Sequence, residues 1–267
     1  MKLSKESIDK ILDLHKGMSS YVLCFGESDK TILIKNIIEN SGGKLVSSEY
    51  VRKERNTELR YTVLIFVGRI NESELNDVER VLVRLGKRAK VILDLTGIKL
   101  SMNRRDIALS FIRKYNISII KGTDEELKAI MKANDKFSYE KKLTKHDRNI
   151  IYLAREFSTI VIERNQNYLT DGYNEFKIND INKDIIDDNI FELIYSSLIA
   201  NCVCNCDESG QIIQSIILRL IALNIKVNDK IISLDQFSNI YKLVENVMDI
   251  DSEALSREYR VCYYFKR

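Results

Sequence analysis

Short, nearly continuous apolar segments alternate with amphipathic segments along much of this chain, and that alternation restricts the folds it can adopt. The clearest apolar segments are YTVLIFVG (61–68) and VILDL (91–95). Uninterrupted apolar runs of this length are typical of strands buried on both faces, as in parallel sheets. The segment between them, NESELNDVERVLVRLG (71–86), can be capped by Asn71 or Ser73, ends in glycine and carries apolar residues at helical spacing: Leu75, Val78, Val81, Leu82 and Leu85.

The same alternation extends over most of the chain and predicts its fold class. Further strands are expected at 21–25, 117–120 and 158–163, and further helices at 6–16, 30–40, 103–115, from 123 onward, and at 145–157, 188–204, 209–223 and 235–247. Alternating strands and helices predict an α/β fold with a mostly parallel sheet covered by helices on both faces. The segment YRVCYYF (259–265) reads as a final strand or a docked tail. No linker or repeat interrupts the chain, so a single domain over residues 1–267 is expected.

Helical spacing groups one set of residues on the same side of the expected helix at 30–40. These residues are Ile32, Leu33, Asn36, Ile37 and Asn40.

Charge and hydropathy argue against several classes of partner. The 42 basic and 39 acidic residues are interleaved and give a formal charge of +3, so no nucleic-acid partner is expected. The longest apolar runs are shorter than the roughly 18 residues that a membrane span needs, so no membrane partner is expected. The N-terminal segment is polar and lacks the apolar core of a secretory signal, which makes a cytoplasmic location the expectation.

The thiols and imidazoles do not form an obvious site. Five cysteines in a chain this long and apolar do not suggest a disulfide framework, although three of them cluster at Cys202, Cys204 and Cys206. On a helix only the first and last of these share a face, and the spacing of structural zinc ligands is absent. Buried thiols are therefore favoured over a metal site. His15 and His146 are isolated and are expected on helix faces or the surface.

Carboxylates and a lysine follow two of the predicted strands. Asp94 lies at the end of VILDL, where ligands bind in parallel α/β sheets, although a lone Asp there can equally cap the next loop. IIKGTDEEL (119–127) ends a strand in Lys121-Gly122 and begins a helix with three acids, which also complement the helix dipole. At the first strand–helix turn, GESDK (26–30) offers a single glycine that could contact a phosphate.

In order and spacing these segments resemble the hydroxyethylthiazole kinase family. LIFVGRINESELNDVERVLVRLGKRAKVILDLTG is similar to a family stretch N-I-G-T-L-N-E, a helix, and V-V-L-D-P-V-G. IIKGTDEEL resembles the family's I-R-G-N-A-S-E-I. LAREFSTIVIERNQNYLTDGYNEFKIND resembles its L-A-x-x-x-G-T-V-V-x-T-G-x-x-D-Y-V-T-D-G. The resemblance runs from about residue 6 to about residue 200.

This resemblance implies a ribokinase-like fold, usually assembled as a homotrimer with active sites between subunits. It implies transfer of the ATP γ-phosphate to the hydroxyl of 4-methyl-5-(2-hydroxyethyl)thiazole in thiamine synthesis and salvage, with ATP and Mg²⁺ required if the protein is active. Asp94 and Glu126 stand at the positions of acids near the metal. The resemblance places the nucleotide or phosphate contacts at Lys121, Gly122, Glu163 and Ile190, and a substrate-lining position at Ser47.

The half of the family site that carries its chemistry is missing. The motif T-G-T-G-C supplies an anion hole and a catalytic cysteine in the family; its positions are held here by Asn189, Ile190, Phe191, Glu192 and Leu193. No shift of alignment restores the motif, because residues 173–209 contain no glycine. Leu193, at the cysteine position, has no acid–base chemistry, so no catalytic residue is assigned. Lys121 also replaces the family's arginine, and Glu163-Arg164 replaces a T-G pair.

Three readings of function follow. The first is a hydroxyethylthiazole kinase-like protein with weak or no activity, a pseudoenzyme. The second is a non-catalytic paralogue that binds a thiazole alcohol or related small molecule, or that serves as a partner subunit in a mixed trimer. The third is a kinase for a different small alcohol, in which Glu163 or Glu192 replaces the missing base.

Overall fold

The protein divides into two compact units, each built from several chain segments. The computed structural model describes residues 5–14, 20–134, 146–178, 187–228, 237–258 and 262–265. Unit 1 comprises 1–23, 28–62 and 178–262, and unit 2 comprises 24–27, 63–177 and 263–267. The strands β1 (Ser20–Phe25) and β3 (Tyr61–Phe66) contribute residues to both units. The single domain expected over 1–267 stays a prediction.

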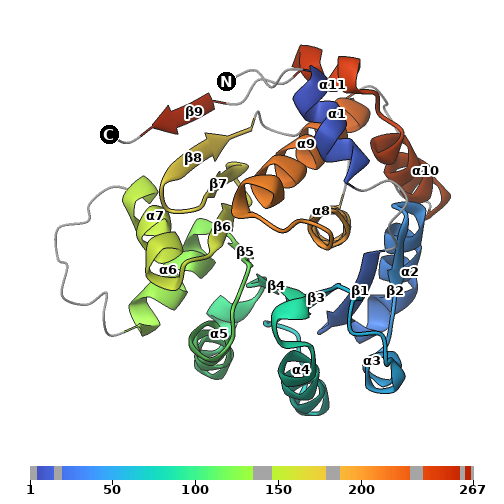
Figure 1. Ribbon diagram of the computed structural model, residues 1–267. Coiled ribbons are helices and arrows are strands. Elements are labelled where there is room, and N and C mark those ends of the chain that lie inside the picture. Colours follow the sequence, from blue (N-terminus) through green and yellow to red (C-terminus); the bar gives the residue numbers. More distant parts are fainter. Residues whose placement is uncertain are drawn as a thin grey trace. The chain divides into compact units, whose positions relative to one another are not determined.

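Unit 2 contains the strands whose ends carry the predicted acidic residues. In the sheet, β3 is followed by β4 (Ala89–Asp94), β5 (Ile119–Gly122) and β6 (Ile160–Glu163), and β4 to β6 run parallel. All six residues of β3 are buried, as its continuous apolar run predicted. In Figure 1, β4 and β5 are drawn in green and β6 in yellow.

Two further strands of unit 2 were not predicted. β7 (Tyr168–Thr170) and β8 (Asn174–Lys177) continue the sheet antiparallel to β6 and to each other, and β9 (Cys262–Phe265) follows β8. They are short and joined by tight turns, in which Asn167 and Gly172 adopt positive φ angles of 48° and 89°. β7 and β8 contain only one or two apolar residues each, too few to indicate a strand, whereas β5 and β6 belong to continuous apolar runs.

The predicted helices of unit 2 lie between its strands, and two of them, α6 and α7, lie between β5 and β6. The helices are α4 (Glu72–Leu85), α5 (Met102–Lys114), α6 (Asp124–Ala133) and α7 (His146–Phe157), with short 3-10 turns η2 (Gly86–Arg88) and η3 (Ile98–Leu100). Asn71 caps α4 and forms a reciprocal capping box with Glu74, and Gly86 ends the helix. The sequence therefore located both ends of α4.

Unit 1 is largely helical. In it β1 pairs in parallel with the short strand β2 (Gly43–Leu45). Its helices are α1 (Lys5–Asp13), α2 (Thr31–Asn40), α3 (Ser48–Lys53), α8 (Asp188–Val203), α9 (Ser209–Asn228), α10 (Phe237–Met248) and α11 (Ser252–Glu258), with the 3-10 turn η1 (Ser28–Lys30). The sequence did not predict β2, α3 or α11. The expected helix at 6–16 ends at Asp13, and His15 lies outside the described residues, as do residues 259–261 of the closing segment.

The long helix α9 lies in the interior of unit 1. It packs against α1, α8, α10 and α11, which are drawn around it in Figure 1. Among the described helices, only α9 is long and apolar enough over Ser209–Val227 to suit a membrane span, but 67% of that stretch is buried within the protein. Burial by its neighbours accounts for the apolar composition of α9.

The buried face of α2 coincides only in part with the side that helical spacing groups together. Ile32, on that side, is 78% exposed. The residues that α2 buries are Leu33, Ile34, Ile37 and Ile38. Because α2 packs against both α8 and α10, its buried face is set by these tertiary contacts, which the helical period alone does not specify.

Gly68, in the turn after β3, is expected to tolerate no larger residue. A β-carbon at this position would overlap the carbonyl oxygen of Thr96 in the loop after β4. We expect Gly68→Ala to lower the free energy of unfolding by about 1–3 kcal/mol, measured by urea denaturation, because the two loops must move apart.

Gly210→Ala is the matched control for this substitution. No atom lies close to a β-carbon at Gly210, which is in the first turn of α9. This variant should equal or slightly exceed the native stability, because alanine favours helix. Equal losses in the two variants would contradict the proposed close approach of the loops.

Candidate functional site

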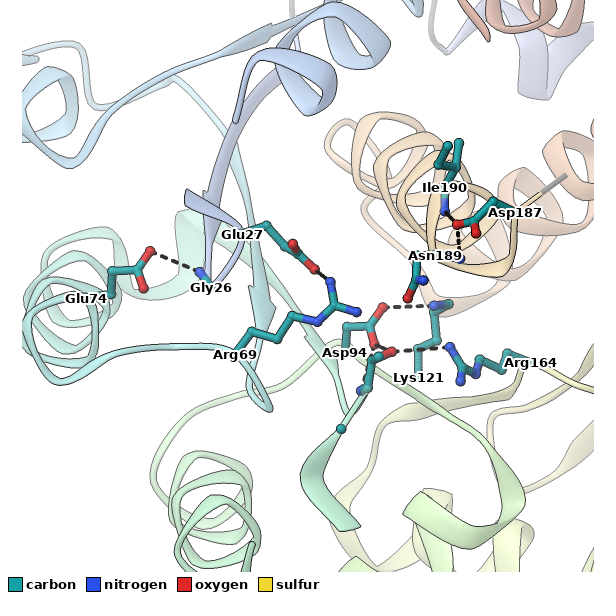
Figure 2. A network of polar contacts seen from close by, with 12 residues as sticks. Gly26, Glu27, Arg69, Glu74, Asp94, Lys121, Arg164, Asp187, Asn189 and Ile190 are labelled. Carbon is teal, nitrogen blue, oxygen red and sulfur yellow. Dashed lines mark hydrogen bonds and ion pairs between the residues drawn. The ribbon is translucent and has the colours of Figure 1, made fainter. Parts of the chain in front are cut away.

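The polar centre of unit 2 is a buried ion pair at the ends of β4 and β5. The parallel register places Asp94 directly beside Lys121, and Lys121 Nζ lies 2.8 Å from Asp94 Oδ2. Both side chains are fully buried. Figure 2 shows the lysine reaching across to the carboxylate. Two charges can be buried in this way only when each neutralises the other, so each of the two residues fixes the ionisation of its partner.

The second carboxylate oxygen of Asp94 accepts hydrogen bonds from the loop after β4. This atom, Oδ1, accepts hydrogen bonds from the backbone N–H of Thr96 at 3.0 Å and from the Thr96 hydroxyl at 2.6 Å. Arg164, which follows β6, donates in turn to that hydroxyl at 3.3 Å. Asp94 therefore caps its own loop, as one reading of the sequence proposed. It also links three neighbouring strand ends through Lys121 and Arg164.

Glu126 is occupied by backbone donors. Thr123 caps α6 and forms a reciprocal capping box with this residue, whose Oε2 accepts the N–H of Thr123 at 2.9 Å. Its Oε1 accepts the N–H of Gly97 at 2.8 Å. Gly97 adopts a left-handed conformation with φ of 85°, which turns its N–H group toward the helix. Glu126 is thus a buried clamp between α6 and the loop after β4.

Glu163, at the end of β6, binds three backbone N–H groups. Its Oε1 accepts from Asp124 at 3.2 Å and Asn165 at 3.1 Å, and its Oε2 accepts from Gln166 at 2.8 Å. The residue is fully buried. Donors from the start of α6 and from the turn after β6 therefore converge on one internal carboxylate. Gly122, its partner in the β5–β6 register, has little free space, since a β-carbon there would lie 3.2 Å from Leu95 Cβ.

The first strand–helix turn repeats this pattern. The N–H of Gly26, which could have contacted a phosphate, donates to Glu74 Oε1 at 3.1 Å. The neighbouring Glu27 is buried and pairs with Arg69, as Figure 2 shows. Burial raises the pKa of the Cys24 thiol on β1, and the charges of Glu27, Glu74 and Asp94 raise it further. Burial is the larger cause of this shift in pKa, and the three carboxylates add to it.

These contacts fit a magnesium site poorly. Mg²⁺ requires a nearly octahedral set of oxygen ligands. Asp94 already binds an ammonium group and two donors of Thr96, and both oxygens of Glu126 accept backbone N–H groups. Within the described part of the chain, no three His, Cys, Asp or Glu residues are grouped as metal ligands. The assignment of Asp94 and Glu126 to a metal remains a prediction from the resemblance.

The remaining predicted positions lie in unit 1. Asp187 caps α8, and its Oδ1 accepts the N–H groups of Asn189 at 2.9 Å and Ile190 at 3.1 Å. These are the amides that occupy the first positions of the missing T-G-T-G-C motif. Leu193, at the cysteine position, is a buried residue of α8. Ser47, predicted to line a substrate site, caps α3 by accepting the N–H of Tyr50 at 3.2 Å.

The cysteine cluster is buried, as predicted. Cys202 lies in α8, Cys204 caps its C-terminal end, and Cys206 lies beyond it and contacts the hydroxyl of Ser215 at 3.4 Å. Burial raises the pKa of the Cys202 and Cys204 thiols. These thiols are therefore protonated and unreactive at neutral pH.

Comparison with known proteins relates the chain to solved structures. A hydroxyethylthiazole kinase protein from Pyrococcus horikoshii OT3 has a TM-score of 0.72 at 16% identity, over 98% of this chain and 100% of that chain. An ADP/ATP-dependent NAD(P)H-hydrate dehydratase from Bacillus subtilis, co-crystallised with ATP and Mg²⁺, has a TM-score of 0.57 at 12% identity, over 91% and 96%. A Bacillus subtilis pyridoxal kinase has a TM-score of 0.51 at 9% identity, over 78% and 92%.

These likenesses identify the fold class. The chain has a ribokinase-like α/β fold, with a mostly parallel sheet and helices on both faces, as the sequence predicted. The hydroxyethylthiazole kinase expected from the sequence is among its structural neighbours. No family model matches the chain, and no curated protein matches it. At these identities the similarity shows the fold alone.

The structure also reveals site residues that the motifs did not identify. Thr96 and Arg164 join the network of Asp94, and Asp187 fills the amides at the start of α8. An Asp directly before an apolar helix is an N-cap signal, so Asp187 could have been found from the sequence. Arg69 had no local signal, because its partner Glu27 lies far from it in sequence.

Neutralising Glu163 should destabilise the protein. Glu163→Gln keeps the size of the side chain but directs an amide NH₂ group at N–H donors that need an acceptor. We expect a loss of about 1.5–3 kcal/mol in the free energy of unfolding, measured by urea denaturation, because hydrogen bonds to a charged acceptor are lost.

Glu125→Gln is the control for this variant. Glu125 lies in the first turn of α6 but is exposed, and its carboxylate pairs with Lys99 at 2.6 Å. Exposed ion pairs contribute little, so its stability should stay near that of the native protein. If Glu163→Gln is as stable as this control, the protein does not need a charged acceptor for the three backbone N–H groups that converge on Glu163.

Proposed function

We propose that the protein is a degenerate hydroxyethylthiazole kinase-like protein with weak or no phosphotransfer activity. The homotrimer or mixed trimer and a small thiazole-like ligand remain expectations of the resemblance, and the cytoplasmic location remains an expectation from the polar N-terminal segment. The proposal rests on the fold and on one property of the sites in the two units. Their backbone N–H groups already donate hydrogen bonds to side chains of the chain itself.

The observation that carries the proposal is that carboxylates of the chain itself occupy backbone amides at strand ends and helix starts, the kind of donor that a phosphate would use. Glu74 accepts the N–H of Gly26, Glu126 that of Gly97, and Glu163 that of Asp124. In unit 1, Asp187 does the same for Asn189 and Ile190. Phosphoryl transfer depends on backbone donors and cations directed at the phosphates. Here a phosphate would have to displace a bonded carboxylate at each of these positions.

Two cationic side chains of unit 2 are likewise already paired with carboxylates of the chain. Lys121, the predicted phosphate contact, neutralises Asp94, and Arg69 neutralises Glu27. A cation that balances an internal carboxylate offers no net positive charge to ATP.

A kinase with a replacement base is less well supported. Glu163 was one candidate base, but its carboxylate is buried and accepts three backbone N–H groups. A general base must be able to reach the proton of a substrate hydroxyl. Withdrawing Glu163 for that purpose would leave three backbone donors without their acceptor.

A direct assay tests the proposal. Purified protein is incubated with ATP, Mg²⁺ and 4-methyl-5-(2-hydroxyethyl)thiazole, and the thiazole phosphate is quantified by mass spectrometry. We expect no product above a protein-free control. An intact hydroxyethylthiazole kinase, assayed in parallel, should turn over at a rate on the order of 1–100 s⁻¹. Turnover by this protein at a comparable rate would overturn the proposal.

Thermal denaturation with the same ligands separates ligand binding from catalysis. A ligand at about 100 times its Kd stabilises a folded protein by about 2.7 kcal/mol. We expect no increase in Tm with Mg²⁺-ATP. An increase with the thiazole alcohol alone would favour the non-catalytic ligand-binding paralogue over a protein without a ligand.

A further inference from the structure

We infer that the ammonium group of Lys121 serves as a permanent internal cation at the acidic end of β4, in the place where the family resemblance puts a divalent metal. The carboxylate of Asp94 is then neutralised by the chain itself, and this edge of unit 2 is independent of metal. The inference concerns metal binding without nucleotide, so it can fail while the proposed loss of phosphotransfer stands.

Backbone register makes this cation a fixed part of the fold. Asp94 and Lys121 are direct partners in the parallel β4–β5 pairing, which brings their side chains to the same edge. The backbone also joins them, because Leu95 N donates to Lys121 O at 2.8 Å. Neither side chain has any exposed surface, and Nζ and Oδ2 are 2.8 Å apart. The ammonium group cannot turn out to solvent without dismantling the end of the strand.

The donor set around this position suits an ammonium better than Mg²⁺. A divalent cation on Asp94 Oδ2 would be repelled by the lysine that already contacts this oxygen. Its expected second ligand, Glu126, holds Gly97 and Thr123 through separate oxygens. A cation recruiting Glu126 would break the capping box of α6 and release the loop after β4. Lysine supplies the balancing charge without either change.

The first test is a titration of the native protein with Mn²⁺ alone, followed by electron paramagnetic resonance, with Asp94→Asn in parallel. Mn²⁺ favours the same oxygen ligands as Mg²⁺. We expect the free Mn²⁺ signal of both proteins to match that of buffer at low millimolar metal. Stoichiometric binding by the native protein that Asp94→Asn abolishes would overturn the inference.

The second test is a double-mutant cycle on the pair. Lys121→Met and Asp94→Asn each leave one buried charge without its partner, and each should lower Tm by roughly 10 °C. The double variant Lys121→Met/Asp94→Asn should lose much less than the sum of the two single losses, because no charge is left unpaired. Additive losses would show that the lysine does not neutralise Asp94.

An exposed ion pair in the same unit provides the matched control. Lys99 and Glu125 are 2.6 Å apart, but their side chains are 53% and 70% exposed. Lys99→Met and Glu125→Gln should each change Tm by only a degree or two, with no resolvable coupling. If a single buried variant does not fold, the Mn²⁺ titration of the native protein is read alone, and stoichiometric binding by it overturns the inference.

Discussion

The ion pair between Asp94 and Lys121 is the contact on which the polar edge of unit 2 depends. Removing two charges from water is costly, and their attraction offsets that cost only in a fixed geometry. The parallel register of β4 and β5 supplies the geometry, since the two residues are direct partners at the strand ends. Backbone hydrogen bonds extend this constraint to the segments that follow β3 and β6. Val67 N donates to Asp94 O, and Arg164 N donates to Gly122 O. The loops that follow β3, β4 and β6 are therefore arranged around one neutral pair.

Around this pair, the chain satisfies its own polar groups. Glu74, Glu126 and Glu163 each join a strand end to the beginning of a helix or a turn by accepting backbone N–H groups. In a phosphotransferase, donors of this kind are directed at a ligand that comes and goes. Here the same kind of group serves as permanent structure. A ribokinase-like fold can thus engage these backbone donors in its own packing.

The hydrophobic pattern located most of the longer strands and helices. It missed short elements with few apolar residues and features that depend on tertiary contacts. The continuous apolar run of β3 and the capping residues Asn71 and Gly86 of α4 gave clear local signals, and the structure has these elements as predicted. β7 and β8 contain too few apolar residues to indicate a strand, and the exposure of Ile32 is decided by the neighbours of α2. The residues at the ends of β4, β5 and β6 could be located from the sequence. Their partners could not, because Asp94 and Lys121 are 27 residues apart and only the sheet register joins them.

The capping of α8 by Asp187 and of α6 by Thr123 and Glu126 has a consequence for the abundance of the protein in a cell. An enzyme whose helix ends are completed by a nucleotide gains stability when that nucleotide is plentiful, so its folded fraction follows metabolite supply. A chain that completes these ends with its own side chains has no such dependence. The contribution of these two caps to the folded fraction is therefore the same in starved and in well-supplied cells.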